Sequence, residues 1–126
     1  MDTKTAKRRI FVVDDETTIA STLALILNSH GFDAVPYTNP LDALRAAETH
    51  SPDLLLTDVS MPQLNGIDLA VQFKAIYPDC KVLLFSGNAA TSGLMDNAMD
   101  EGHSFELLAK PVQPKDLIAT ISSMIS

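Results

Sequence analysis

Three aspartates lie where apolar stretches of the chain end. Asp14 and Asp15 follow the apolar run 10–13, and Asp58 follows the run 54–57. If these runs are neighbouring parallel strands, their carboxyl ends meet at one edge of a sheet and the three carboxylates share a small cleft. A hard divalent cation such as Mg²⁺ takes oxygen ligands and offsets the repulsion between carboxylates. The spacing therefore predicts a metal site, with Asp15 and Asp58 as direct ligands and Asp14 acting directly or through water.

A hydroxyl and an ammonium group belong to the same predicted edge. Ser86 and Lys110 each follow a later apolar run, and Pro111 is expected to hold the turn after Lys110. A carboxylate can attack phosphorus and form an aspartyl phosphate, and phosphoryl transfer depends on positioning and on charge neutralisation at the transferred oxygens. Asp58 is therefore the candidate nucleophile. Lys110 would supply a compact positive charge, and Ser86 would donate a hydrogen bond to a phosphoryl oxygen.

Each of these residues also has a purely structural interpretation. Asp14 and Asp15 could merely cap the helix expected after them, because acidic residues favour helix N-termini. Ser86 could be a turn residue, and Lys110 could serve solubility alone. The third aspartate, Asp58, at an equivalent strand end favours the functional interpretation.

Alternating apolar runs and helical patterns predict the elements that would position this site. Four apolar runs and a weaker one ending near Pro36 predict five strands, and Pro36 indicates an edge strand because proline cannot donate to a ladder. Such alternation predicts parallel strands joined by right-handed crossovers, with helices on both faces. The expected fold is α/β: a flavodoxin-like doubly wound (βα)5 three-layer sandwich with the strand order 2-1-3-4-5. Its functional site lies outside the carboxyl ends of the strands.

Five helical segments are expected between and after these strands. The first begins at Thr17 and is stopped by Gly31, and the fourth spans 88–101 with a thin apolar stripe interrupted by Gly93. The apolar stripes expected to be buried in the second, third and fifth helices comprise Leu41, Leu44 and Ala47; Leu69, Ala70, Phe73, Ile76 and Tyr77; and Leu117, Ile118, Ile121, Met124 and Ile125.

The whole chain has the size and composition of one ordinary domain. It has 126 residues, of which 46% are hydrophobic, and a formal net charge of -7. That charge argues against direct nucleic-acid binding, which needs a basic face. Cys80 is the single cysteine, so no internal disulfide can form. We expect a polar leader over residues 1–8, one domain over 9–126, no membrane span and a cytoplasmic location.

The chain resembles the receiver domain of bacterial two-component response regulators over roughly residues 8 to 125. The matching blocks are 12–16, 57–62, 65–66, 85–87 and 110–111, in this order and at these spacings. The resemblance implies that Asp58 accepts a phosphoryl group from a sensor histidine kinase or phosphotransfer protein. It implies Mg²⁺ or Mn²⁺ held by Asp14, Asp15, Asp58 and the main-chain oxygen of Ser60. It also implies that Ser86 and Lys110 contact the phosphoryl group and couple it to a conformational change.

The chain departs from the family pattern at the switch aromatic. The family often carries Tyr or Phe three residues before the lysine, where this chain has Leu107, and Phe105 could face the same side of the strand. No output domain is visible, so the protein is either a stand-alone receiver acting on a downstream protein target or part of a longer protein.

Two other functions compete with the phosphorylated switch. A receiver-like protein-binding module would work without phosphorylation. An aspartate-nucleophile phosphatase of the haloacid dehalogenase type would need a second acid where Ser60 stands and a cap insertion that the chain lacks. The favoured interpretation is a signalling domain that catalyses only its own phosphoryl transfer and slow autodephosphorylation.

Overall fold

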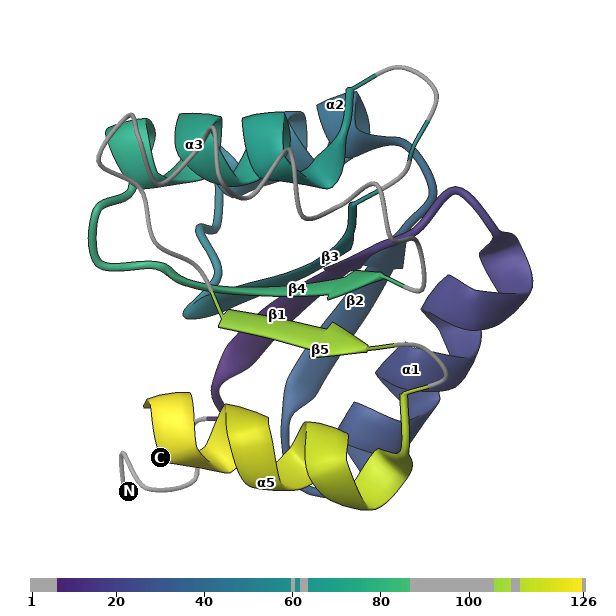
Figure 1. The fold of residues 1–126 in the computed structure, drawn as a ribbon. Helices are drawn as coiled ribbons and strands as arrows, with labels where there is room; N and C mark the ends of the chain where they lie inside the picture. Colours follow the sequence, from purple (N-terminus) through teal and green to yellow (C-terminus); the bar gives the residue numbers. More distant parts are fainter. Residues whose placement is uncertain (1–6, 60, 62–63, 87–105, 110–111, 126) are drawn as a thin grey trace.

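Five parallel strands form a single sheet with helices on both of its faces (Figure 1). The computed structural model describes residues 7–59, 61, 64–86, 106–109 and 112–125. Within them the sheet has the order β2-β1-β3-β4-β5, which confirms the predicted doubly wound α/β fold. The helix predicted over 88–101 falls outside the described residues.

The described elements follow the predicted runs closely. The strands are β1 (Arg9–Val13), β2 (Asp33–Tyr37), β3 (Leu54–Asp58), β4 (Lys81–Ser86) and β5 (Glu106–Ala109). The helices are α1 (Thr17–Ser29), α2 (Pro40–Ala47), α3 (Gly66–Ile76) and α5 (Pro114–Ile125). None of these helices has the length and hydropathy that a bilayer span requires.

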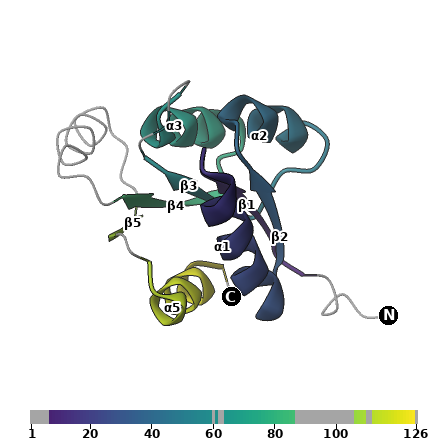
Figure 2. The same cartoon turned by 90° about the vertical axis from the view of Figure 1, so that its right-hand side faces the viewer.

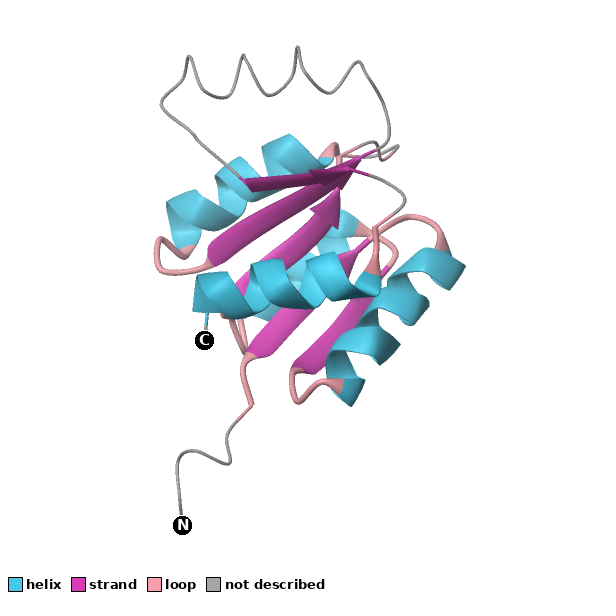
Figure 3. Ribbon diagram, turned by 60° about the horizontal axis from the view of Figure 1, so that its bottom comes forward, coloured by secondary structure: helices cyan, strands magenta, loops and turns pink. Residues whose placement is uncertain are grey.

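Two apolar cores lie on opposite faces of the sheet. Helices α2 and α3 cover one face, and α1 and α5 cover the other (Figures 1 and 2). Successive strand residues point to opposite faces, so Phe11 packs in the core with α3 while Ile10 and Val12 pack in the core with α1 and α5. Because β1, β3 and β4 are covered on both sides (Figure 3), their sequences are nearly continuous apolar runs.

Local chemistry sets the helix ends. Gly31, which follows α1, has a φ of 91°, a conformation that glycine adopts without steric cost. Asn39 and Asn65 are the N-caps of α2 and α3, and their side chains accept hydrogen bonds from the amides of Leu41 and Asp68. Both helices therefore begin directly after a capping asparagine.

Two residues predicted to be buried are exposed. Leu41 is 48% exposed because α2 buries Pro40, Ala43 and Ala47, a stripe that turns Leu41 toward solvent. Ile76 is 59% exposed because α3 ends there. Tyr77 instead lies against the core, with its ring centroid 5.7 Å from that of Phe73.

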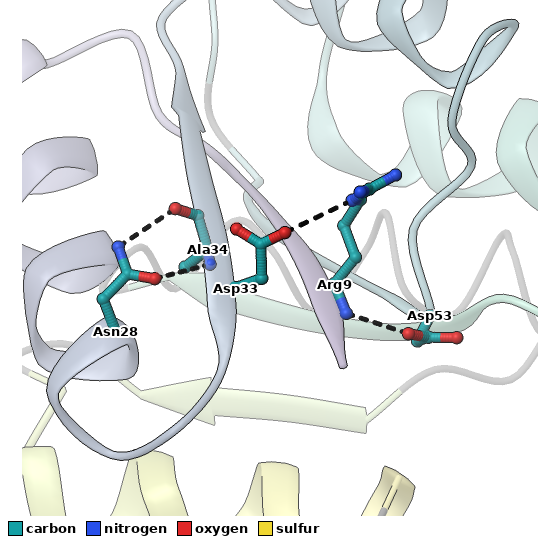
Figure 4. A network of polar contacts seen from close by, with 5 residues as sticks. All are labelled: Arg9, Asn28, Asp33, Ala34 and Asp53. Carbon is teal, nitrogen blue, oxygen red and sulfur yellow. Dashed lines mark hydrogen bonds and ion pairs between the residues drawn. The ribbon is translucent and has the colours of Figure 1, made fainter. Parts of the chain in front are cut away.

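Polar contacts hold the amino ends of the strands together (Figure 4). The Arg9 amide donates to Asp53 Oδ2 at 2.8 Å, and the Asp53 amide donates to the Arg9 carbonyl at 2.8 Å. The Arg9 guanidinium lies 3.6 Å from the Asp33 carboxylate. Asn28 joins α1 to β2, since its side chain both donates to and accepts from the backbone of Ala34. Hydrogen bonds and an ion pair thus tie this end of the sheet, while Asp14, Asp15 and Asp58 lie at the opposite end.

Candidate functional site

Three aspartates meet at the carboxyl ends of β1 and β3. Asp14 and Asp15 directly follow β1, and Asp58 is the last residue of β3. The two strands are neighbours, with Val13 opposite Thr57. One carboxylate oxygen from each aspartate lies within 4.8 Å of those from the other two. The structure therefore brings together the three acids that the strand-end pattern singled out.

The three carboxylates differ in environment. Asp14 is fully buried and Asp58 nearly so, whereas Asp15 is exposed. The Asp14 backbone amide donates to the Tyr37 carbonyl at 3.1 Å, and Asp14 Oδ1 accepts from the Glu16 amide at 2.8 Å. Asp14 is thus anchored to the β2 end and to the entry of α1, while Asp15 faces solvent beside it.

The capping interpretation of these acids holds in part. The N-cap of α1 is Glu16, which makes no side-chain cap hydrogen bond, and Asp14 accepts from its amide instead. Asp14 therefore does help to order the helix entry. Capping of α1 gives no reason for Asp58 to lie beside this turn, because Asp58 belongs to another strand.

The donor set fits a hard divalent cation. Three carboxylates supply only oxygen atoms, and two of them are withdrawn from water. Charges of one sign at such separations repel one another more strongly where water is excluded. Mg²⁺ binds through one or two carboxylates and keeps several waters, and Mn²⁺ prefers the same ligands. The solvent-facing Asp15 leaves one side of the cluster open to such waters.

The backbone around Asp58 is fixed by contacts from three directions. The Thr57 hydroxyl donates to the Asp58 carbonyl at 3.0 Å. The next amide, of Val59, donates to the Phe85 carbonyl at 3.2 Å, and the Val59 carbonyl accepts from the Gly66 amide at 2.8 Å. The segment that carries Asp58 is therefore tied to its own strand, to β4 and to the start of α3.

Gly66 makes the closest of these approaches. A Cβ on Gly66 would overlap the Asp58 carbonyl oxygen and would lie 2.9 Å from the Asp58 carbonyl carbon and 3.0 Å from Val59 Cα. Only a residue without a side chain lets the first turn of α3 lie against the Asp58 peptide. The sequence pattern alone assigned no role to Thr57 or Gly66; a hydroxyl at the end of an apolar strand and a glycine directly after a helix cap were the available signals.

The remaining predicted site residues divide into two groups. Ser86 is buried at the end of β4, where the preceding Phe85 pairs with Asp58, so Ser86 lies at the same edge of the sheet. Leu107 lies on β5 opposite Leu84 and is exposed. The others fall outside the described residues: Ser60, Phe105, Lys110 and Pro111.

Cys80 lies far along β4 from Ser86, just before the strand begins. Burial raises the pKa of its thiol to about 11, although the positive charge of Lys74 opposes this rise. The thiol donates to the Lys81 carbonyl at 3.3 Å. These features describe a buried structural cysteine, whose thiol stays protonated at neutral pH.

Comparison with known proteins gives consistent matches. The family model described as the response regulator receiver domain matches residues 10–122. The DNA-binding response regulator MtrA of Mycobacterium tuberculosis is 31% identical over 121 residues, which cover 96% of this chain and 52% of MtrA. The chain thus spans about half the length of the curated relatives it matches.

Solved structures agree with the fold. The response regulator receiver domain protein from Clostridium thermocellum is 32% identical, with a TM-score of 0.83 and coverage of 94% of each chain. The CheY-like receiver domain protein from Methanospirillum hungatei is 25% identical, with a TM-score of 0.85 and coverage of 95% of this chain and 94% of the other.

Proposed function

This chain belongs to the response regulator receiver domain family, and on that premise we propose that it is a signalling switch phosphorylated on Asp58. The family consists of signalling domains and not of classical enzymes. The observation that carries the proposal is the meeting of Asp14, Asp15 and Asp58 within 4.8 Å of one another. A carboxylate beside two others suits a metal-assisted phosphoryl acceptor better than a role in folding alone, since buried like charges are costly without a cation.

The proposed metal ligands are the three aspartates and the main-chain oxygen of Ser60. When bound, Mg²⁺ or Mn²⁺ neutralises charge on the transferred phosphoryl oxygens. Asp14, fixed by its hydrogen bond from the Glu16 amide, would supply a negative charge to the site, and the exposed Asp15 would be a direct ligand of the ion. Asp58 faces the same cluster and keeps an oxygen for reaction with phosphorus.

The proposed transfer is a displacement at phosphorus. The Asp58 carboxylate oxygen forms a new bond to phosphorus while the bond from phosphorus to a histidine nitrogen of the donor protein breaks, and that nitrogen keeps the electron pair. Ser86, at the same sheet edge, donates a hydrogen bond to the arriving phosphoryl group. Lys110 would balance the charge of that group, and Pro111 would hold the turn after Lys110. Leu107 and Phe105 are the candidate positions for the conformational response.

The proposed partners are a sensor histidine kinase or phosphotransfer protein upstream and a downstream protein target. Residues 9–126 would act as one receiver domain behind a short leader, residues 1–8. Slow autodephosphorylation would reset the switch. Direct nucleic-acid binding by this domain is not expected at a net charge of -7. The cytoplasmic location stays a prediction.

Labelling by a small phosphodonor tests the proposal. The protein is incubated with Mg²⁺ and acetyl phosphate, and its intact mass is measured. We expect one added phosphoryl group that is lost in alkali, no adduct in Asp58→Asn, and none after chelation of the metal. Asp42→Asn is the matched control, because Asp42 is an exposed acid on α2 paired with Arg45; it should label as the wild type does.

The competing functions give different outcomes in the same assay. No adduct, under conditions that label another receiver domain, would favour a protein-binding module that works without phosphorylation. Repeated turnover of added phosphomonoesters would favour the phosphatase.

A further inference from the structure

Thr57 follows three leucines in β3 and directly precedes Asp58, the last residue of the strand. Its side chain is fully buried, and strand alternation places it with Leu55 on the face that α2 and α3 cover. A hydroxyl withdrawn from water is costly unless it finds a partner. The partner here is the carbonyl of the very next residue, Asp58, at 3.0 Å.

The same carbonyl is confined from a second side. The first turn of α3 lies directly against it, so that Gly66 has no space for a side chain. The amide of the same peptide, the Val59 N–H, donates to the Phe85 carbonyl, and the Val59 carbonyl accepts from the Gly66 amide. The Thr57 hydroxyl is the only one of these restraints among the described residues that comes from a side chain.

We propose that Thr57 is a positioning residue, whose hydroxyl fixes the peptide after Asp58 and thereby sets where the Asp58 carboxylate lies relative to Asp14 and Asp15. This inference rests on the proposed function. The Asp58 Cα joins the restrained peptide to the carboxylate, so a rotation of that peptide moves the reacting oxygen. Reactions that depend on positioning are sensitive to shifts of about 1 Å, which can cost on the order of 100-fold in rate.

Two substitutions separate the hydroxyl from the rest of the side chain. Thr57→Val keeps the branched shape and removes the donor, so a methyl group would face the Asp58 carbonyl. Thr57→Ser keeps the donor and removes only the methyl group. Leu55→Val is the matched control: it removes a methylene from the same buried face of β3 without touching the Asp58 carbonyl.

The experiment measures Mg²⁺-dependent labelling by acetyl phosphate over a range of donor concentrations. For Thr57→Val we expect the maximal labelling rate to fall about 5-fold, the factor that one lost hydrogen bond corresponds to, with the half-saturating donor concentration unchanged. Thr57→Ser should label within about twofold of the wild type. Leu55→Val should lower the thermal midpoint and keep the wild-type labelling rate.

Several outcomes would overturn the inference. It fails if Thr57→Val labels at the wild-type rate, if Thr57→Ser is as slow as Thr57→Val, or if Leu55→Val slows labelling equally. A Thr57→Val protein that shows no cooperative thermal transition by circular dichroism would make the hydroxyl a folding group, which also contradicts the proposal. Absence of labelling in the wild type is a separate result: it removes the proposed function, and this inference with it.

Discussion

The glycine at the start of α3 offers the sharpest test of how the Asp58 segment is held. Gly66→Ala would ordinarily stabilise a helix, by at most about 1 kcal/mol from propensity and by ~0.4–1 kcal/mol from a less flexible unfolded chain. Here the new Cβ would overlap the Asp58 carbonyl oxygen and lie 2.9 Å from its carbon. These are backbone atoms, so no side chain can rotate away.

The size of the effect follows from that overlap. Contacts between non-bonded carbon atoms are most favourable near ~3.5–4.0 Å, so the start of α3 or the Asp58 peptide must move by on the order of 1 Å. Overpacking of this kind costs about 1–3 kcal/mol, and the 2.8 Å bond from the Gly66 amide to Val59 weakens as well. We expect Gly66→Ala to lower the free energy of unfolding by about 1–2 kcal/mol and to slow Asp58 labelling by roughly 10- to 100-fold.

Urea unfolding followed by circular dichroism, and the acetyl phosphate assay, measure the two effects. Gly31→Ala is the control, because Gly31 has a φ of 91° and a Cβ added to it would meet no atom within 4 Å. Gly31→Ala should lower the free energy of unfolding by about 1 kcal/mol through backbone strain and leave the rate of Asp58 labelling unchanged. If Gly66→Ala is as stable as the wild type and is labelled equally fast, the close packing of α3 on the Asp58 peptide affects neither stability nor phosphorylation, and the prediction is wrong.

Four further predictions concern the metal, the N-cap of α3 and, twice, the Cys80 thiol. Asp15→Asn should weaken Mn²⁺ binding by at least about tenfold, because the loss of a group that merely hydrogen-bonds to a metal ligand already lowers metal affinity by about that factor. The affinity is measured by electron paramagnetic resonance, and an unchanged value would remove Asp15 from the ligand set. Asn65→Ala should lower the free energy of unfolding in urea by about 1 kcal/mol because the cap of α3 is lost, and an unaltered midpoint would contradict this. Cys80, whose pKa is raised to about 11, should react with iodoacetamide at pH 8 about 100-fold more slowly in the native than in the urea-unfolded protein, because only the thiolate reacts. Burial of the neutral Cys80 thiol contributes stability below pH 9.0, and this contribution is lost as the pH rises toward about 11. Over that pH range a Cys80→Ala variant should therefore lose less stability than the wild type. Equal losses in the two proteins would contradict the effect of burial on the thiol.

The sheet and its acidic edge could be predicted from the sequence because both follow from strand patterning. Buried parallel strands produce unbroken apolar runs, and Pro36 indicated which strand lies at the edge; the observed order β2-β1-β3-β4-β5 follows. Once β1 and β3 are neighbours, Asp14, which directly follows β1, and Asp58, the last residue of β3, must meet.

The details of packing could not be predicted in this way. The phase of a helix against a sheet depends on tertiary contacts, so Leu41 and Ile76 were wrongly expected in the core. The roles of Thr57 and Gly66 depend on how closely the β3–α3 connection returns to Asp58, a distance that no periodicity encodes. Lys110 lies outside the described residues, and its part in the site stays a prediction from its place after an apolar run.

We propose that the phosphoryl group is attached to Asp58. The most direct measurement is to label the protein with acetyl phosphate and Mg²⁺, reduce the acyl phosphate with borohydride, and locate the reduced residue by peptide mass spectrometry. We expect that residue 58 alone is converted to homoserine. Conversion of a different carboxylate, or of none in a protein that remains folded and bound to the metal, would contradict the claim.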